Sequence, residues 1–177
     1  MNKYLLELHR ACFSENTDIA EEARLLSRYL IEYHLVDGNE EYKKEVSGYL
    51  IPSENLRGLI GLSNQSLRDS GVELSEIHSF SYLFVNDLTI KEPIDRRWIA
   101  SVIKQAGNVA GISESLEAYL SNHWRDDEIT SGHILDVIWD VSILKKLIPT
   151  LELMSSDAES EELRDFCRTR VLLLKSL

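Results

Sequence analysis

The densest group of side chains capable of chemistry lies in residues 123–140, HWRDDEITSGHILDVIWD. This stretch holds two histidines, five carboxylates and two tryptophans. Imidazole and carboxylate groups are metal ligands and general acids or bases, so the composition suits an active site. The same residue types also suit the start of an amphipathic helix. The surrounding pattern has to separate these two interpretations.

A helix with Thr130 as its N-cap and a break at Pro149 explains the stretch. In that helix His133, Asp136 and Asp140 stand at i, i+3 and i+7 and share one polar stripe. Four apolar residues occupy the adjacent, core-facing side: Ile134, Val137, Ile138 and Val141. Three carboxylates precede the helix near its positive end, where they are stabilising: Asp126, Asp127 and Glu128. The pattern therefore favours a helix entry with a solvated acidic face.

A metal or catalytic site lacks further support. Metal binding needs ligands that converge with a defined geometry, and no second cluster completes the His133 stripe. The remaining histidines are scattered: His9, His34, His78 and His123. No GxxxxGK[ST], GxGxxG, HExxH or GxSxG motif occurs, and Gly58 and Gly61 favour close helix packing over phosphate binding. We expect no catalytic residue, metal or cofactor; a metal-dependent helical enzyme stays as a third alternative.

Helix signals run the length of the chain. Segments with apolar residues at spacings of three and four begin near residues 2, 18, 39, 53, 75, 95, 113, 130 and 157. Asp18 is the expected cap of the second, which stops at Asp37-Gly38, while the fourth runs from Ser53 to Asp69. FSYLFV, residues 80–85, would also suit a strand, but the flanking caps favour a helix.

The predicted fold is therefore all-α, an irregular bundle of about nine helices in a single domain, residues 1–177. Alternate helix starts lie about 37 residues apart, which is typical of stacked helical hairpins. However, the segments show no residue self-similarity, so an irregular bundle, slightly solenoid-like at most, is preferred over a true repeat array.

The compartment is expected to be cytoplasmic. The apolar run in MNKYLLELHRACF is broken by Glu7, His9 and Arg10, unlike the core of a signal peptide. No run of eighteen apolar residues predicts a transmembrane helix. Cys12 and Cys167 stand far apart without a CxxC motif, as expected of free thiols in a reducing compartment.

The charge balance bears on partners. Thirty acids against 19 bases give a net charge of −11. Such a surface repels phosphate backbones and anionic membranes, so we expect neither nucleic acid nor membrane as a partner. A basic protein partner is favoured by complementary charge, although the charge also has the simpler role of keeping the protein soluble.

Three acidic patches are candidates for a binding surface. The first is Glu15, Asp18, Glu21 and Glu22; the last is Asp157, Glu159, Glu161, Glu162 and Asp165. The middle patch also has Trp124 and Trp139 nearby, so we predict partner binding there, through Trp124, Asp126, Asp127, Glu128, Asp136 and Asp140. Helix-dipole stabilisation and core packing remain the structural alternatives. If these acids lie on a polar face, removing all five should disturb folding only modestly.

As a whole, this short, acidic, single-domain chain without catalytic motifs resembles the immunity proteins of bacterial toxin–immunity systems of the contact-dependent growth inhibition type. The resemblance implies a cytosolic inhibitor that occludes a cognate cationic toxin, often a nuclease and in some cases an EndoU-type RNase. It carries over no individual residue. The alternative function is a helical adaptor, in which FSYLFV and the tryptophans line an apolar groove and salt hardly affects affinity.

Overall fold

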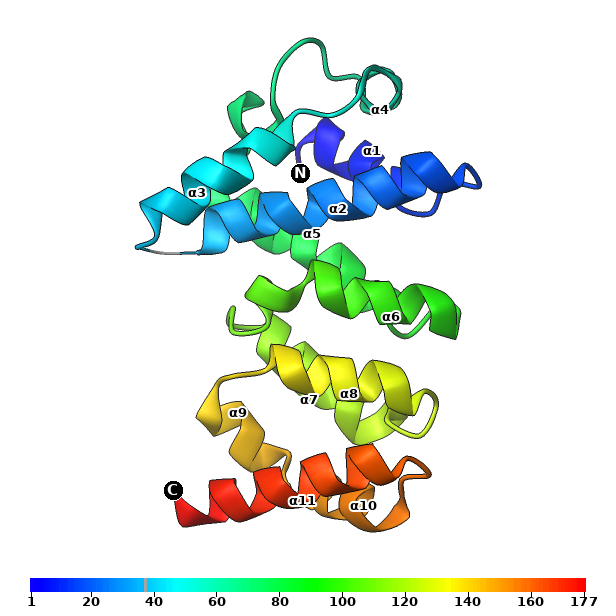
Figure 1. Cartoon of the computed structure of the whole chain (residues 1–177), viewed down its shortest axis with the longest axis vertical. Coiled ribbons are helices and arrows are strands. Elements are labelled where there is room, and N and C mark those ends of the chain that lie inside the picture. The colour runs from blue at the N-terminus through cyan, green and yellow to red at the C-terminus, as the bar shows by residue number, and fades with distance from the viewer. Residues whose placement is uncertain (37) are drawn as a thin grey trace. The chain divides into compact units, whose positions relative to one another are not determined.

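The computed structural model describes residues 1–36 and 38–177. Across these residues the chain forms eleven α-helices and three short 3-10 turns, and it contains no strand (Figure 1). The all-α prediction is confirmed, with two more helices than expected. By its internal contacts the chain divides into unit 1, residues 1–86 and 101–106, and unit 2, residues 87–100 and 107–177. The single domain over residues 1–177 stays a prediction.

Unit 1 is built on a long helix packed against shorter ones. Its helices are α1 Lys3–Ala11, α2 Thr17–Leu35, α3 Glu40–Ser47, α4 Glu54–Ile60 and α5 Leu74–Asp87, with 3-10 turns at Gly48–Leu50, Leu67–Asp69 and Lys104–Ala106. Residues 80–85 are helical, as predicted. Phe80 and Phe84, one turn apart on α5, are fully buried and meet edge to face with ring centroids 5.2 Å apart. Apolar burial along one face therefore explains why this aromatic segment is a helix.

Two predicted helix boundaries in unit 1 are wrong. Asn16, not Asp18, caps α2, because its side chain accepts a hydrogen bond from the Ile19 N–H. The helix that Ser53 does cap ends at Gly61, which adopts φ 71°, and not at Asp69. The close-packing interpretation of the glycines is also wrong, because nothing lies within 4 Å of a Cβ built at Gly58. Gly61 instead ends α4 in the left-handed conformation.

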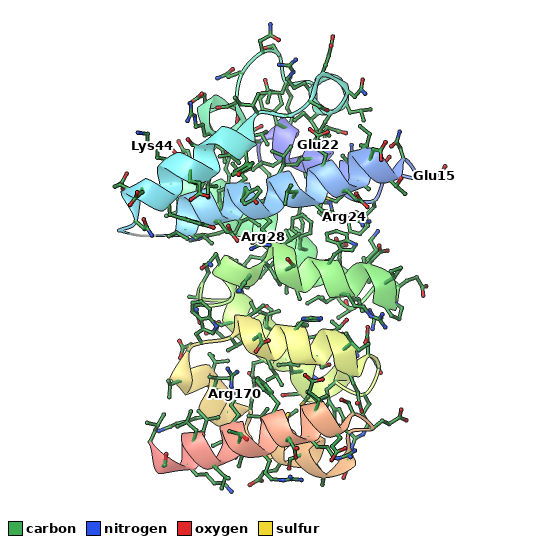
Figure 2. All side chains as sticks on the ribbon, viewed as in Figure 1. Glu15, Glu22, Arg24, Arg28, Lys44 and Arg170 are labelled. Atoms are coloured by element: carbon green, nitrogen blue, oxygen red, sulfur yellow. The ribbon has the colours of Figure 1, made fainter. Side chains whose placement is uncertain are left out.

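One acid of the first patch has a structural role. Glu22, labelled on α2 in Figure 2, has a partner in a distant segment. It accepts hydrogen bonds from the backbone N–H and the hydroxyl of Ser53, at 2.6 Å and 2.7 Å. Its carboxylate therefore ties the start of α4 to α2. The other three acids of the patch are exposed: Glu15, Asp18 and Glu21.

The second predicted helix is expected to stop at Asp37-Gly38. Asp37 lies outside the described residues, and Gly38 has φ 78°.

A buried carboxylate fastens α3 to α2. Glu32 is 1% exposed and accepts hydrogen bonds from Arg28 Nε at 2.8 Å and from the Tyr42 hydroxyl at 2.6 Å. The hydrogen bond between Tyr42 and Glu32 is the main reason that the pKa of Tyr42 is raised to about 12. The carboxylate is thus paired with both a cation and a neutral donor, which compensates for its burial.

Unit 2 contains most of α6 and five further helices. They are α6 Pro93–Val102, α7 Ile112–His123, α8 Glu128–Val137, α9 Val141–Lys146, α10 Ile148–Asp157 and α11 Glu161–Ser176. Helices α10 and α11 form a hairpin and lie side by side (Figure 1). Nowhere in residues 1–36 or 38–177 is a helix both long and apolar enough to cross a membrane.

The single helix predicted from Thr130 to Pro149 is wrong. The N-cap of α8 is Asp127, three residues before Thr130, and the helix ends at Val137. Pro149 lies in the first turn of α10, where proline is tolerated. The break has a long-range cause. The Asn108 side-chain oxygen accepts hydrogen bonds from the backbone N–H groups of Trp139 and Asp140, at 3.0 Å and 2.9 Å. Those two donors are therefore not available to continue α8.

Candidate functional site

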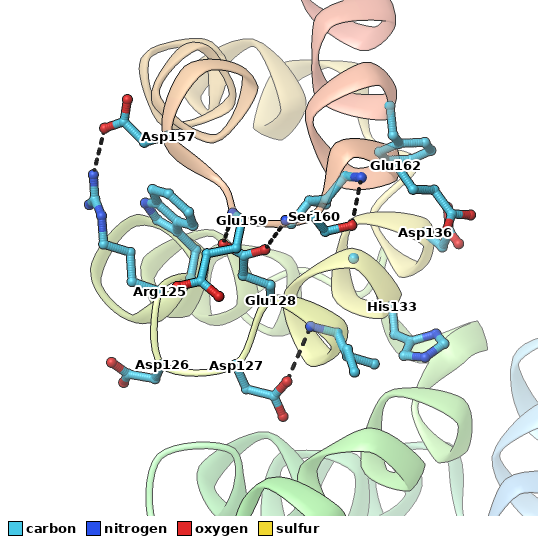
Figure 3. Close-up of a pocket in the computed structure, with 15 residues that line it drawn as sticks. Arg125, Asp126, Asp127, Glu128, His133, Asp136, Asp157, Glu159, Ser160 and Glu162 are labelled. Carbon is cyan, nitrogen blue, oxygen red and sulfur yellow. Dashed lines mark hydrogen bonds and ion pairs between the residues drawn. The ribbon is translucent and has the colours of Figure 1, made fainter.

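Unit 2 contains a groove of about 750 Å³ whose lining includes many acidic side chains (Figure 3). Its wall is formed by the α7–α8 connection, one face of α8, the end of α10 with the α10–α11 connection, and the start of α11. The lining residues are Trp124, Arg125, Asp126, Asp127, Glu128, Ile129, Gly132, His133, Asp136, Asp157, Glu159, Ser160, Glu162, Leu163 and Phe166. Seven of these are carboxylates, and we call this surface the acidic groove. Five of the six predicted binding residues line it.

The groove joins the middle and last acidic patches, which the sequence presents as alternatives. Glu128, in the first turn of α8, accepts hydrogen bonds from the backbone N–H groups of Glu159 and Ser160, at 2.7 Å and 3.0 Å (Figure 3). Ser160 in turn caps α11, since its hydroxyl accepts from the Leu163 N–H. Glu128 therefore places a negative charge at the positive end of α11, and this contact brings the two patches onto one surface.

Asp127 is part of the fold. It is 8% exposed and caps α8 by accepting hydrogen bonds from the backbone N–H groups of Ile129 and Thr130. The Thr130 hydroxyl donates a further hydrogen bond at 2.8 Å, and the Arg97 guanidinium lies 3.7 Å away. With its lone pairs occupied in this way, Asp127 fixes the edge of the groove and has little capacity left for a partner.

Trp124 supports the groove wall more than it presents a contact surface. Its side chain is only 2% exposed, and the Arg125 guanidinium lies 4.2 Å from its ring centroid. Arg125 also donates a hydrogen bond to Asp157 at 3.0 Å (Figure 3). The Ser156 hydroxyl and, less strongly, Arg125 lower the pKa of Asp157. The predicted central contact is therefore mostly a buried anchor, overlaid by an arginine.

Three groove carboxylates have no such partner. Asp136, Glu159 and Glu162 are exposed, and no hydrogen bond or ion pair from a described residue reaches their carboxylate oxygens. Asp136 projects from α8, and Glu162 projects from the first turn of α11 (Figure 3). By contrast, Asp126 lies 2.9 Å from His123 Nδ1. The groove thus holds three unneutralised negative charges on a concave surface, which suits it to bind cationic groups.

Asp140 is the one predicted binding residue outside the groove. It caps α9, where its Oδ1 accepts hydrogen bonds from the Ser142 N–H, the Ser142 hydroxyl and the Ile143 N–H. The Ser142 hydroxyl is the main cause of its lowered pKa. The predicted stripe of His133, Asp136 and Asp140 on one helix is wrong, because α8 ends at Val137.

The apolar groove expected of the adaptor alternative is also not where it was predicted. Phe80 and Phe84 are fully buried, as is nearly all of Trp124. Trp139 is 53% exposed, but its Nε1 donates to the Asp136 backbone carbonyl at 2.7 Å. A shallow hollow with apolar side chains lies instead on α11; its lining residues are Asp165, Phe166, Thr169, Arg170 and Leu173.

Residues that the sequence did not single out for binding complete the groove, notably Arg125, Ile129 and Phe166. Phe166 belongs to a predicted helix, but its position beside α8 depends on how α11 packs.

Throughout the described part of the chain, no three His, Cys, Asp or Glu side chains are arranged to hold a metal ion. No family model, curated protein or solved structure matches this chain.

Proposed function

We propose that this protein binds a cationic protein through the acidic groove and inhibits it, in the manner of an immunity protein that neutralises a toxin. The observation that supports this function is the set of three exposed carboxylates, Asp136, Glu159 and Glu162, which have no cationic partner among the described residues. Lysine and arginine side chains of a partner would supply the missing counter-charges.

The surrounding structure favours binding to a pre-formed surface. Asp127 and Glu128 use their carboxylates to fix the starts of α8 and α11, so Asp136 and Glu162 project from anchored helices. Glu159 precedes α11, and its own backbone N–H is bonded to Glu128. Little side-chain or loop ordering is then required on binding, which preserves affinity. The net charge of −11 adds a long-range field that accelerates the approach of a basic protein.

Inhibition follows if the partner uses the same basic groups for its own substrate. A nuclease presents lysine and arginine to phosphate oxygens, and an acidic groove competes for those groups. A toxin with nuclease activity, such as an EndoU-type RNase, is the specific form of partner that the sequence resemblance suggests. The acidic groove would cover the substrate-binding surface of this toxin.

The test compares two triple variants with the same change in charge. The groove variant is Asp136→Asn, Glu159→Gln and Glu162→Gln. The control is Glu15→Gln, Asp18→Asn and Glu21→Gln, three exposed acids of unit 1 without a described bonding partner. Both are assayed against the basic protein that co-purifies with the natural chain, by association kinetics at low and high salt and by inhibition of that protein's activity.

We expect association with the groove variant to slow by about tenfold or more at low salt and by less at high salt, because salt screens exposed charges. Inhibition should weaken in parallel. The control should stay within about twofold of the natural protein. Equal losses in both triple variants would show that only net charge matters, and the acidic groove would then be rejected as the site.

A further inference from the structure

We infer that the segment bound by the acidic groove is a helix that lies along the outer face of α11. The face of this helix that contacts α11 has basic residues at one end and apolar residues at the other. This inference rests on the proposed function and specifies the kind of partner surface. It is carried by a second feature of α11, the hollow around Phe166 and Leu173, which adjoins the acidic groove.

Helix α11 has a ridge in addition to its core face, and every residue of the ridge except the half-buried Phe166 is exposed. The core face is buried and consists of Leu163, Cys167, Val171 and Leu174. The ridge consists of Glu162, Phe166, Thr169 and Leu173, whose spacings of four, three and four place them on one side of the helix. Its first residue is acidic, whereas Leu173, near its far end, is 59% exposed. The ridge therefore changes from charged to apolar along its length.

Phe166 makes the two hollows continuous, because it lines both. Its ring is held in place by Arg170, whose guanidinium lies 5.0 Å from the ring centroid and donates to the Leu135 carbonyl of α8 at 2.7 Å. The positive charge of Arg170 is thus engaged with α8 and the aromatic ring. A partner would meet a fixed aromatic surface between the free acids and Leu173.

The order of these side chains along α11 specifies the chemistry of the partner segment. Basic side chains belong beside Asp136, Glu159 and Glu162, and apolar ones belong over Phe166 and Leu173. The eleven residue steps from Glu162 to Leu173 span roughly 16 Å of helix, which corresponds to about three turns of a partner helix. A second copy of this chain fits poorly, since each copy carries a net charge of −11 and would bring its own acidic groove to the contact.

The test separates the apolar end from the acidic end. Leu173→Ser removes the exposed apolar side chain, and Leu59→Ser in unit 1 is the matched control, because Leu59 is 58% exposed. The probe is a labelled synthetic helical peptide of about three to four turns, with arginines on one face of its first half and leucines on the same face of its second half. A scrambled peptide of the same composition is the comparison, and affinity is measured by fluorescence anisotropy at low and high salt.

We expect the patterned peptide to bind about tenfold more tightly than the scrambled one. Leu173→Ser should weaken this binding about tenfold at both salt concentrations, since apolar burial is not screened by salt. Leu59→Ser should leave it unchanged. No binding of the patterned peptide, equal affinity for both peptides, or no effect of Leu173→Ser would overturn the inference. If the groove triple variant still binds the natural partner more weakly in that case, the proposed function stands without this inference.

Discussion

The Glu128 carboxylate accepts a hydrogen bond at 3.0 Å from the backbone N–H of Ser160, the residue that caps α11. The two residues are 32 positions apart. Two other side chains bind backbone N–H groups 31 positions ahead of them, Glu22 at Ser53 and Asn108 at Trp139. In all three cases the bonded backbone lies at or just before the start of a helix. Side chains on one helix or connection thus fix where a later helix begins.

Glu128→Ala should destabilise the protein by about 1–2 kcal/mol, because it removes a charged cap from two backbone donors at the start of α11. Glu21→Ala, at an exposed acid on α2 without a described partner, should cost less than about 0.5 kcal/mol. Urea unfolding followed by circular dichroism measures both. Equal stabilities of the two variants would contradict a capping role for Glu128.

Asp127→Ala should cost about 2–3 kcal/mol, because it leaves three donors of α8 without their acceptor in a buried position. Asp126→Ala is the neighbouring control; its carboxylate is half exposed and pairs with His123, so a loss of under about 1 kcal/mol is expected. Thermal melts separate the two. This outcome would also correct the expectation that all five predicted acids can be removed with little effect on folding.

Gly107→Ala should destabilise unit 2 by about 2–4 kcal/mol, because an added Cβ would overlap the backbone carbonyl and side chain of Val137. Gly58→Ala is the opposite case, since its Cβ would meet nothing within 4 Å on a helical residue. It should raise stability by about 0.5–1 kcal/mol. Unfolding curves of the two variants check the difference in sign; a harmless Gly107→Ala would refute the close approach of residue 107 to α8.

Tyr42 should make stability fall at alkaline pH. Its pKa is about 12 in the folded protein, whereas a tyrosine in an unfolded chain has a pKa of about 10. The stabilisation is therefore complete below about pH 10 and is lost as the pH rises towards 12, because the unfolded chain releases the proton first. The stability difference between the natural protein and Tyr42→Phe should shrink from about pH 8 to about pH 11. Urea unfolding at both pH values measures it, and a constant difference would contradict the Glu32 hydrogen bond.

Much of the candidate site is visible in the sequence as composition, but its geometry is not. Most residues from Trp124 to Asp136 line the acidic groove, and the sequence shows a local run of acids there. The sequence does not show that Asp157, Glu159 and Glu162 line the same groove. Their position depends on the hydrogen bonds that Glu128 accepts from the backbone of Glu159 and Ser160, which lie 31 and 32 positions away. Nor does it distinguish the acids that cap helices from those that remain free.

The amino-acid sequence by itself determined the all-α class, the Ser53 cap and the placement of the aromatic segment 80–85 in a helix. These features depend on local spacing and on side chains that bond to backbone a few residues away. Tertiary structure decided where α8 ends, which acids meet across α8 and α11, and that Trp124 is buried while Leu173 is exposed. Those outcomes depend on contacts such as that of Asn108 with Trp139, in which side chains from distant segments compete with local helix formation for the same backbone groups.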